Sequence, residues 1–161
     1  MLNTKKSARR QLRFASLDEL LADLDRIEAA EKAGTLRTTG NWTAGEILTH
    51  VAAWIDYGYE GYPVKPPPFF IRWFLRRMLP TILRDGMKPG VKIPGLKGGT
   101  TGAEKVETAE GIARLRRSVA RLATGEAEKY PSPAFGPLSP SQRIELQLRH
   151  AELHLGFLAL Q

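Results

Sequence analysis

Three helix-start signals divide the sequence, and each stands before a stretch of apolar residues at helical spacing. In a capping box, a serine or threonine side chain accepts a hydrogen bond from the backbone N–H three residues later. The glutamate or glutamine at that later position accepts, through its side chain, a hydrogen bond from the backbone N–H of the serine or threonine. The boxes are formed by Ser16 with Glu19, Thr43 with Glu46, and Ser139 with Gln142. Pro140 occupies a first helical position, where its missing N–H costs nothing. The sequence therefore predicts three helices that begin at Leu17, at Trp42 or Thr43, and at Pro140.

The apolar spacing indicates how far the helices extend. The first helix should reach about Lys32, just before Gly34. The second is expected to turn inward Ile47, Val51, Trp54 and Ile55, with Trp42 as a hydrophobic staple on Ile47. A further helix is predicted from about Val106 to Ala123, with Gly125 as its stop. The last helix is expected to run to the C-terminus, with an inward stripe made of Leu146, His150, Leu153, His154 and Phe157.

No stretch of the sequence shows sustained alternation of period two, and no internal repeat is present. The chain has 161 residues, which is the size of one ordinary domain with a sizeable core. The prediction is an all-α bundle of four main helices in a single domain that spans residues 1–161.

Residues 63–102 differ in kind from the helical stretches, because prolines and a cluster of glycines interrupt them. They predict a long crossover between the second and third main helices. Inside it, residues 69–83 (FFIRWFLRRMLPTIL) are apolar and basic at once, which predicts a short helix bent at Pro80. This segment has too many arginines and too little length for a membrane span.

The formal charge of +7 is concentrated in two segments. Five basic residues lie in an N-terminal tail, residues 1–13, and eight lie in residues 63–97 with a single acid, Asp85. No helix-turn-helix, zinc-finger or RNA-binding signature accompanies this charge, so nucleic acid is not expected as a partner.

The aromatic and basic part of the crossover leaves three uses open. Its aromatic residues beside Arg72, Arg76 and Arg77 would suit association with a membrane surface. The interpretation that we favour at this point is that the aromatics close over the bundle or form a homodimer contact, while the arginines stay solvated. The positive charge would also attract an acidic thiol or carboxylate substrate.

The chain contains no cysteine, so disulfides and thiolate metal sites are excluded. Any metal must be held by nitrogen and oxygen atoms. The basic N-terminal residues are followed by an acidic amphipathic stretch rather than by an apolar signal-peptide core. We therefore expect a cytoplasmic protein.

All three histidines of the chain stand at positions that suit a metal site. His150 and His154 are four residues apart, so they project from one helix face, and His50 lies on the predicted inward face of the second helix. Three neutral imidazoles on two facing helices would leave one coordination position of a metal open. The alternative is that each histidine is a hydrogen-bonded core residue.

The stretches GNWTAGEILTHVAAWID and PAFGPLSPSQRIELQLRHAELHLGFL resemble the DinB-like superfamily, in a subfamily catalogued as a domain of unknown function. The resemblance covers nearly the whole chain. It implies an up-down-down-up four-helix bundle with a long connection between helices two and three. It also implies a divalent metal, zinc or nickel, bound by His50, His150 and His154.

The resemblance implies a metal-dependent enzyme that acts on a small molecule. Characterised relatives include thiol-dependent isomerases and S-transferases, so a low-molecular-weight thiol is a candidate cosubstrate, and a hydrolase is a further possibility. A bundle without catalytic activity, which uses the crossover to bind a membrane surface or a protein, is the alternative function.

Other polar and aromatic side chains near the histidines receive no catalytic role from the sequence. Glu46 is explained by its capping box, and Glu152 is expected to point outward. Trp42 and Trp54 are interpreted as core and staple residues, with a substrate wall as the alternative. Three further residues near the histidines are left without a role: Tyr57, Tyr59 and Arg149.

Overall fold

The structure is a computed structural model that describes residues 3–93, 96 and 99–161. Within these residues the chain forms five α-helices and one small two-stranded sheet. In chain order the elements are α1 (Leu17–Lys32), β1 (Leu36–Thr38), α2 (Ala44–Glu60), α3 (Phe69–Asp85), α4 (Thr108–Ala123), α5 (Pro140–Leu155) and β2 (Leu158–Leu160). The prediction of a predominantly helical protein is confirmed.

Capping hydrogen bonds confirm the predicted starts of α1 and α5, whereas α2 begins at Ala44, just beyond the predicted Trp42 or Thr43, because Thr43 is its N-cap. The Ser16 side chain accepts from the backbone of Glu19 and caps α1. The Thr43 and Ser139 boxes are reciprocal, since Glu46 and Gln142 bond back to the backbone of the capping residue. Local hydrogen bonding therefore fixes where α1, α2 and α5 begin.

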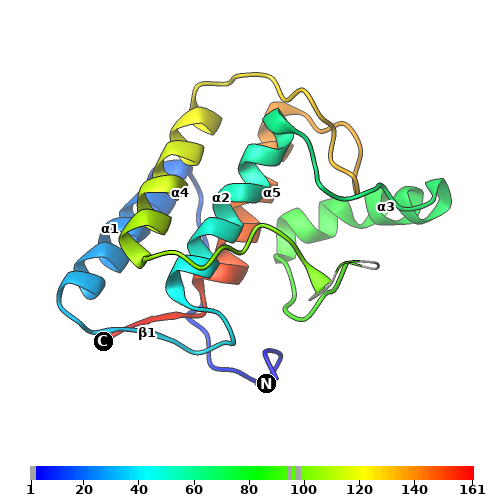
Figure 1. Ribbon diagram of the computed structural model, residues 1–161. Helices are drawn as coiled ribbons and strands as arrows, with labels where there is room; N and C mark the ends of the chain where they lie inside the picture. Colours follow the sequence, from blue (N-terminus) through cyan, green and yellow to red (C-terminus); the bar gives the residue numbers. More distant parts are fainter. Residues whose placement is uncertain (1–2, 94–95, 97–98) are drawn as a thin grey trace.

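Four of the helices pack around one hydrophobic core (Figure 1). α2 contacts α4 and α5, and α1 contacts the same two helices. The largest fully buried apolar side chains come from all four helices and from β2: Leu20, Leu24, Ile27, Ile47, Leu48, Val51, Ile55, Leu115, Leu122, Leu155 and Leu158. This core holds α2 and α5 beside one another, which positions the histidine-bearing segments.

The prediction that the last helix runs to the C-terminus is wrong. α5 ends at Leu155 with Gly156 as its C-cap, and residues 158–160 pair antiparallel with residues 36–38, with Leu36 opposite Leu160. Phe157 and Leu158 are buried in the core, so leaving the helix places both apolar side chains inside. Strands of three residues are too short to show a period-two pattern, which is why the sequence did not indicate them.

The crossover helix is longer than predicted. α3 comprises 17 residues, as many as α2, and it continues through Pro80. Its C-terminal half packs on α5 through a second apolar cluster formed by Leu79, Leu83 and Leu146. Its N-terminal half extends away from the other helices (Figure 1).

The N-terminal segment before α1 lies against the helices. The Arg10 guanidinium forms two hydrogen bonds with the fully buried carboxylate of Asp23, at 2.8 and 2.9 Å. Its backbone N–H donates to the carbonyl of Gly156. These contacts connect the start of the chain to α1 and to the end of α5.

Candidate metal centre

The structure brings the three histidines together between α2 and α5. His50 lies midway along α2, and His150 and His154 lie one turn apart on α5. One ring nitrogen from each histidine falls within a group whose atoms all lie within 4.8 Å of one another. The ring centroids are 5.0 Å apart for His50 and His150, and 4.4 Å for His50 and His154. The predicted proximity of these three side chains is therefore found.

The sequence predicted that the histidines of the last helix lie on its inward, core-filling face. In the structure, the face of α5 that fills the core is a different one. At 100° per residue, Leu148, Ala151 and Leu155 share one side of the helix, and all three are buried in the main core. His150 and His154 point to a different side and are only partly buried. The cluster therefore lies at the margin of the core, on the side of α5 away from Leu148, Ala151 and Leu155.

A backbone carbonyl fixes the tautomer of His50. Its Nδ1 lies 2.8 Å from the carbonyl oxygen of Thr101. A carbonyl oxygen only accepts, so Nδ1 must carry the proton, and the lone pair of the neutral ring then lies on Nε2. This Nε2 faces His150, with 3.2 Å between the two Nε2 atoms. An N–H donated to a carbonyl on the far side is the usual arrangement of a metal-binding histidine.

The end of the crossover that carries Thr101 is held against α2. The buried Thr49 hydroxyl donates to the carbonyl of Gly45 and accepts from the backbone N–H of Glu104. At Gly102, φ is +86°, and a Cβ there would lie 2.6 Å from the Cβ of Ala53. Glycine lets the crossover adopt this conformation and approach α2 closely. The end of the crossover thus serves as a support for His50.

Burial keeps the three imidazoles neutral. His50 is 2% exposed, and desolvation lowers its pKa to about 4, against the opposing hydrogen bond to Thr101. Burial also lowers the pKa of His150 and of His154 well below the ordinary value of 6.5, and charge repulsion among the rings adds to this. Neutral imidazoles present lone pairs at neutral pH, which is the state that binds a metal ion.

The donor set of the cluster, and the spacing between His50 and His150, fit a tetrahedral divalent metal. Two nitrogens at about 2.0–2.1 Å from a tetrahedral zinc ion would be about 3.3–3.4 Å apart, close to the 3.2 Å between the Nε2 atoms of His50 and His150. His50, His150 and His154 are the residues that would hold the ion.

Aromatic side chains line the cluster on two sides. Trp42 stacks on His154 with 5.7 Å between ring centroids and an interplanar angle of 12°. Trp54 contacts His150 edge-on with 5.9 Å between ring centroids, and Tyr57 and Tyr62 also pack against this indole. The indole N–H of Trp54 is buried without a partner in the described part of the chain. The two tryptophans, which the sequence suggested as core and staple residues, therefore also form walls of the site.

Glu152 and Arg149 do not belong to the site. The prediction that Glu152 points outward is wrong: it is buried, and its carboxylate accepts from the backbone N–H of Phe14 at 2.6 Å and from Arg149 at 3.1 Å. Arg149 also donates to the carbonyl of Phe14. Both residues connect α5 to the N-terminal segment. Glu46 forms its capping box as predicted, and Tyr59 packs beneath the guanidinium of Arg121.

The fold and the cluster together define a class, a mostly helical protein in which two neighbouring helices present three histidines that could hold a metal ion. The chain belongs to the family described as "Protein of unknown function (DUF1569)", whose model matches residues 6–161. This confirms the predicted membership of a domain family of unknown function. Comparison with the curated proteins and with the solved structures finds no match.

Proposed function

We propose that His50, His150 and His154 bind a divalent metal ion, zinc or nickel, and that the protein is a metal-dependent enzyme acting on a small molecule. The observation that carries this proposal is the convergence of three neutral imidazoles, one of them with its tautomer fixed by the Thr101 carbonyl. The competing interpretation is an N–H···N hydrogen bond between His50 and His150. In both interpretations the buried Nδ1 of His150 is without a partner among the described residues, so measurement of bound metal is what distinguishes them.

We further propose that the chain is a DinB-like four-helix bundle in which α1, α2, α4 and α5 are the four bundle helices. The order of the histidines supports this proposal, with one midway along the second bundle helix and an i, i+4 pair on the last. The long segment between α2 and α4, which contains α3, corresponds to the long connection of that superfamily.

The proposed chemistry is activation of a nucleophile. A divalent ion held by three neutral ligands supplies Lewis acidity, which lowers the pKa of water or of a thiol in its open position. The metal-competent group found among the described residues consists of histidines alone, so the full charge of the ion would remain available. Since the chain contains no cysteine, a thiol would come from a cosubstrate. The reaction class that we favour is thiol-dependent S-transfer or isomerisation, with hydrolysis as the alternative.

A screen of small thiols against electrophilic acceptors tests this proposal. The protein is prepared without an affinity tag and loaded with zinc or nickel. The reaction is followed by the consumption of free thiol and by mass spectrometry of the products. We expect turnover with at least one pair and its loss in His150→Ala. Turnover of an ester or amide in the absence of thiol would favour the hydrolase. Equal rates for wild type and His150→Ala with every pair would contradict the enzyme proposal.

A further inference from the structure

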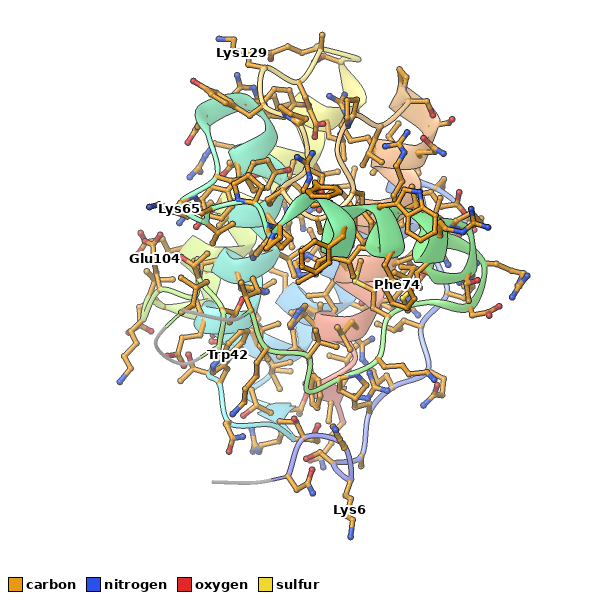
Figure 2. All side chains as sticks on the ribbon, turned by 90° about the vertical axis from the view of Figure 1, so that its right-hand side faces the viewer. Lys6, Trp42, Lys65, Phe74, Glu104 and Lys129 are labelled. Carbon is orange, nitrogen blue, oxygen red and sulfur yellow. The ribbon has the colours of Figure 1, made fainter. Side chains whose placement is uncertain are left out.

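The N-terminal half of α3 exposes a continuous group of large aromatic side chains. Phe69, Phe70, Trp73 and Phe74 have exposed fractions of 82, 59, 63 and 58%. The expectation that these aromatics close over the bundle is therefore wrong. Only Leu79 and Leu83 of this helix are buried, and both lie in its C-terminal half. Figure 2, which looks onto the projecting side of the molecule, shows Phe74 beside α3 on the face toward the viewer.

The helix is held firmly although its aromatic end projects. The Arg76 guanidinium donates to the carbonyls of Phe135 and Pro137, at 2.6 and 2.8 Å. The apolar cluster around Leu79 and Leu83 packs the other half of α3 on the loop and helix that carry Phe135 and Leu146. The exposed aromatics therefore stand on a fixed helix, and binding through them would need little ordering of the chain.

Positive charge surrounds the exposed aromatics. No acidic residue occurs from Gly61 to Arg84, whereas this stretch carries five cations: Lys65, Arg72, Arg76, Arg77 and Arg84. The Arg77 guanidinium lies 5.1 Å from the ring centroid of Trp73, so charge and aromatic surface occupy the same place. Arg84 is paired with Asp85, and the other four cations have no acidic neighbour within this stretch.

We propose that α3 is an interfacial helix that binds the surface of an anionic lipid bilayer. Phe69, Phe70, Trp73 and Phe74, the α3 aromatics, would enter the boundary between headgroups and acyl chains. Lys65 and Arg77, which are exposed, would contact lipid phosphates, whereas the Arg72 guanidinium lies beside Gly136. Helices that lie in a membrane interface combine aromatic side chains with arginines. Burial of the apolar rings and attraction of the arginines to anionic lipid then act together. None of the helices among the described residues is long and apolar enough to cross a membrane, so contact through α3 would be peripheral.

Charge distinguishes a bilayer from a second copy of the chain as the occupant of this face. A symmetric dimer through α3 would place two identical faces against each other, and each would bring the same excess of cations. Like charges in such a contact repel, whereas anionic headgroups neutralise them. An anionic surface that accepts aromatic rings is therefore the partner that this face fits best.

Co-sedimentation of the full chain with lipid vesicles tests the proposal. Vesicles of phosphatidylcholine are compared with vesicles that also contain phosphatidylglycerol, at low and at high salt. We expect binding to the phosphatidylglycerol vesicles and weakening by salt. The double substitution Phe70→Ser and Phe74→Ser should reduce the partition coefficient by about tenfold or more, since two phenyl rings no longer leave water. Arg77→Gln should reduce it by roughly fivefold, as expected for one cation at such a surface.

Arg117→Gln is the matched control, because it removes the same charge from an exposed position on α4. It should bind as the wild type does. Far-UV circular dichroism melting checks that the variants remain folded, which we expect because the altered side chains are exposed. Wild type that stays in the supernatant with phosphatidylglycerol vesicles overturns the proposal. Unchanged vesicle binding by the Phe70→Ser, Phe74→Ser variant would also overturn it. The same holds if light scattering shows a wild-type dimer, the variant is a monomer, and neither protein binds vesicles.

Discussion

The buried, neutral state of His50 predicts that the metal-free protein loses stability as the pH falls. The unfolded chain takes up a proton on this histidine at its ordinary pKa of 6.5, whereas the folded chain takes it up only near 4. The unfolded state therefore binds more protons between these values, and the free energy of unfolding rises with pH across this window. The stability that His50 contributes is lost progressively as the pH falls from about 6.5 toward 4.

The size of the effect follows from the two pKa values. Between about pH 7 and about pH 5, protonation of His50 in the unfolded state should lower the free energy of unfolding by about 2 kcal/mol. Carboxylates titrate over part of the same range, so the effect is isolated by comparison with His50→Gln, which cannot be protonated. The loss of stability on acidification should be smaller in the variant by about 2 kcal/mol.

Urea denaturation followed by tryptophan fluorescence measures this difference. Both proteins are treated with a chelator, because bound metal would stabilise the folded state by mass action. The change with pH is compared between the two proteins rather than their absolute stability, since the substitution also alters packing. Parallel pH dependences in wild type and variant would refute the assignment of His50 as a buried neutral imidazole.

Three further predictions concern the surroundings of the site. Thr49→Val removes the hydroxyl that holds the end of the crossover on α2, so zinc affinity measured by chelator competition should fall by about tenfold. The control Thr81→Val, at an exposed position of α3, should leave zinc affinity unchanged. Zinc affinity of the wild type should vary by less than about twofold between about pH 8 and about pH 6, because its imidazoles stay neutral. In a site of three histidines with ordinary pKa values, the affinity would fall about 60-fold over the same range. A fall of that size would contradict the lowered pKa values. Glu152→Ala leaves Arg149 buried without its partner and should lower the free energy of unfolding by about 3–5 kcal/mol; a loss as small as that of exposed Glu31→Ala would show that the pair is not structural.

Helix starts could be predicted from the sequence because capping is local chemistry. A side chain at the N-cap and its partner three residues later determine the first turn without help from the rest of the chain. The spacing of His150 and His154 is equally local, since residues four apart on a helix share a face. These features explain why α1, α2, α5 and the histidine pair could be predicted.

Features that depend on long-range contacts could not be predicted. The side of α5 that fills the core is set by where α1, α2 and the N-terminal segment pack, so the predicted stripe through Leu146 and Leu153 was placed on the wrong face. Glu152 faces inward because the backbone N–H of Phe14, far away in the sequence, supplies a donor. The role of the Thr101 carbonyl depends on the path of a glycine-containing crossover. Each of these features becomes visible only when distant segments are brought together.

Metal analysis of the purified protein tests the central proposal most directly. The chain is expressed without an affinity tag, incubated with zinc or nickel, desalted, and measured by plasma emission spectrometry beside His150→Ala and His154→Ala. The three converging imidazoles predict about one ion per chain in the wild type and little in either variant. Loss of an outer hydrogen-bond partner can weaken metal binding by roughly 100-fold, and loss of a ligand should weaken it more. Equal and low metal content in the wild type and both variants would contradict a metal centre at His50, His150 and His154.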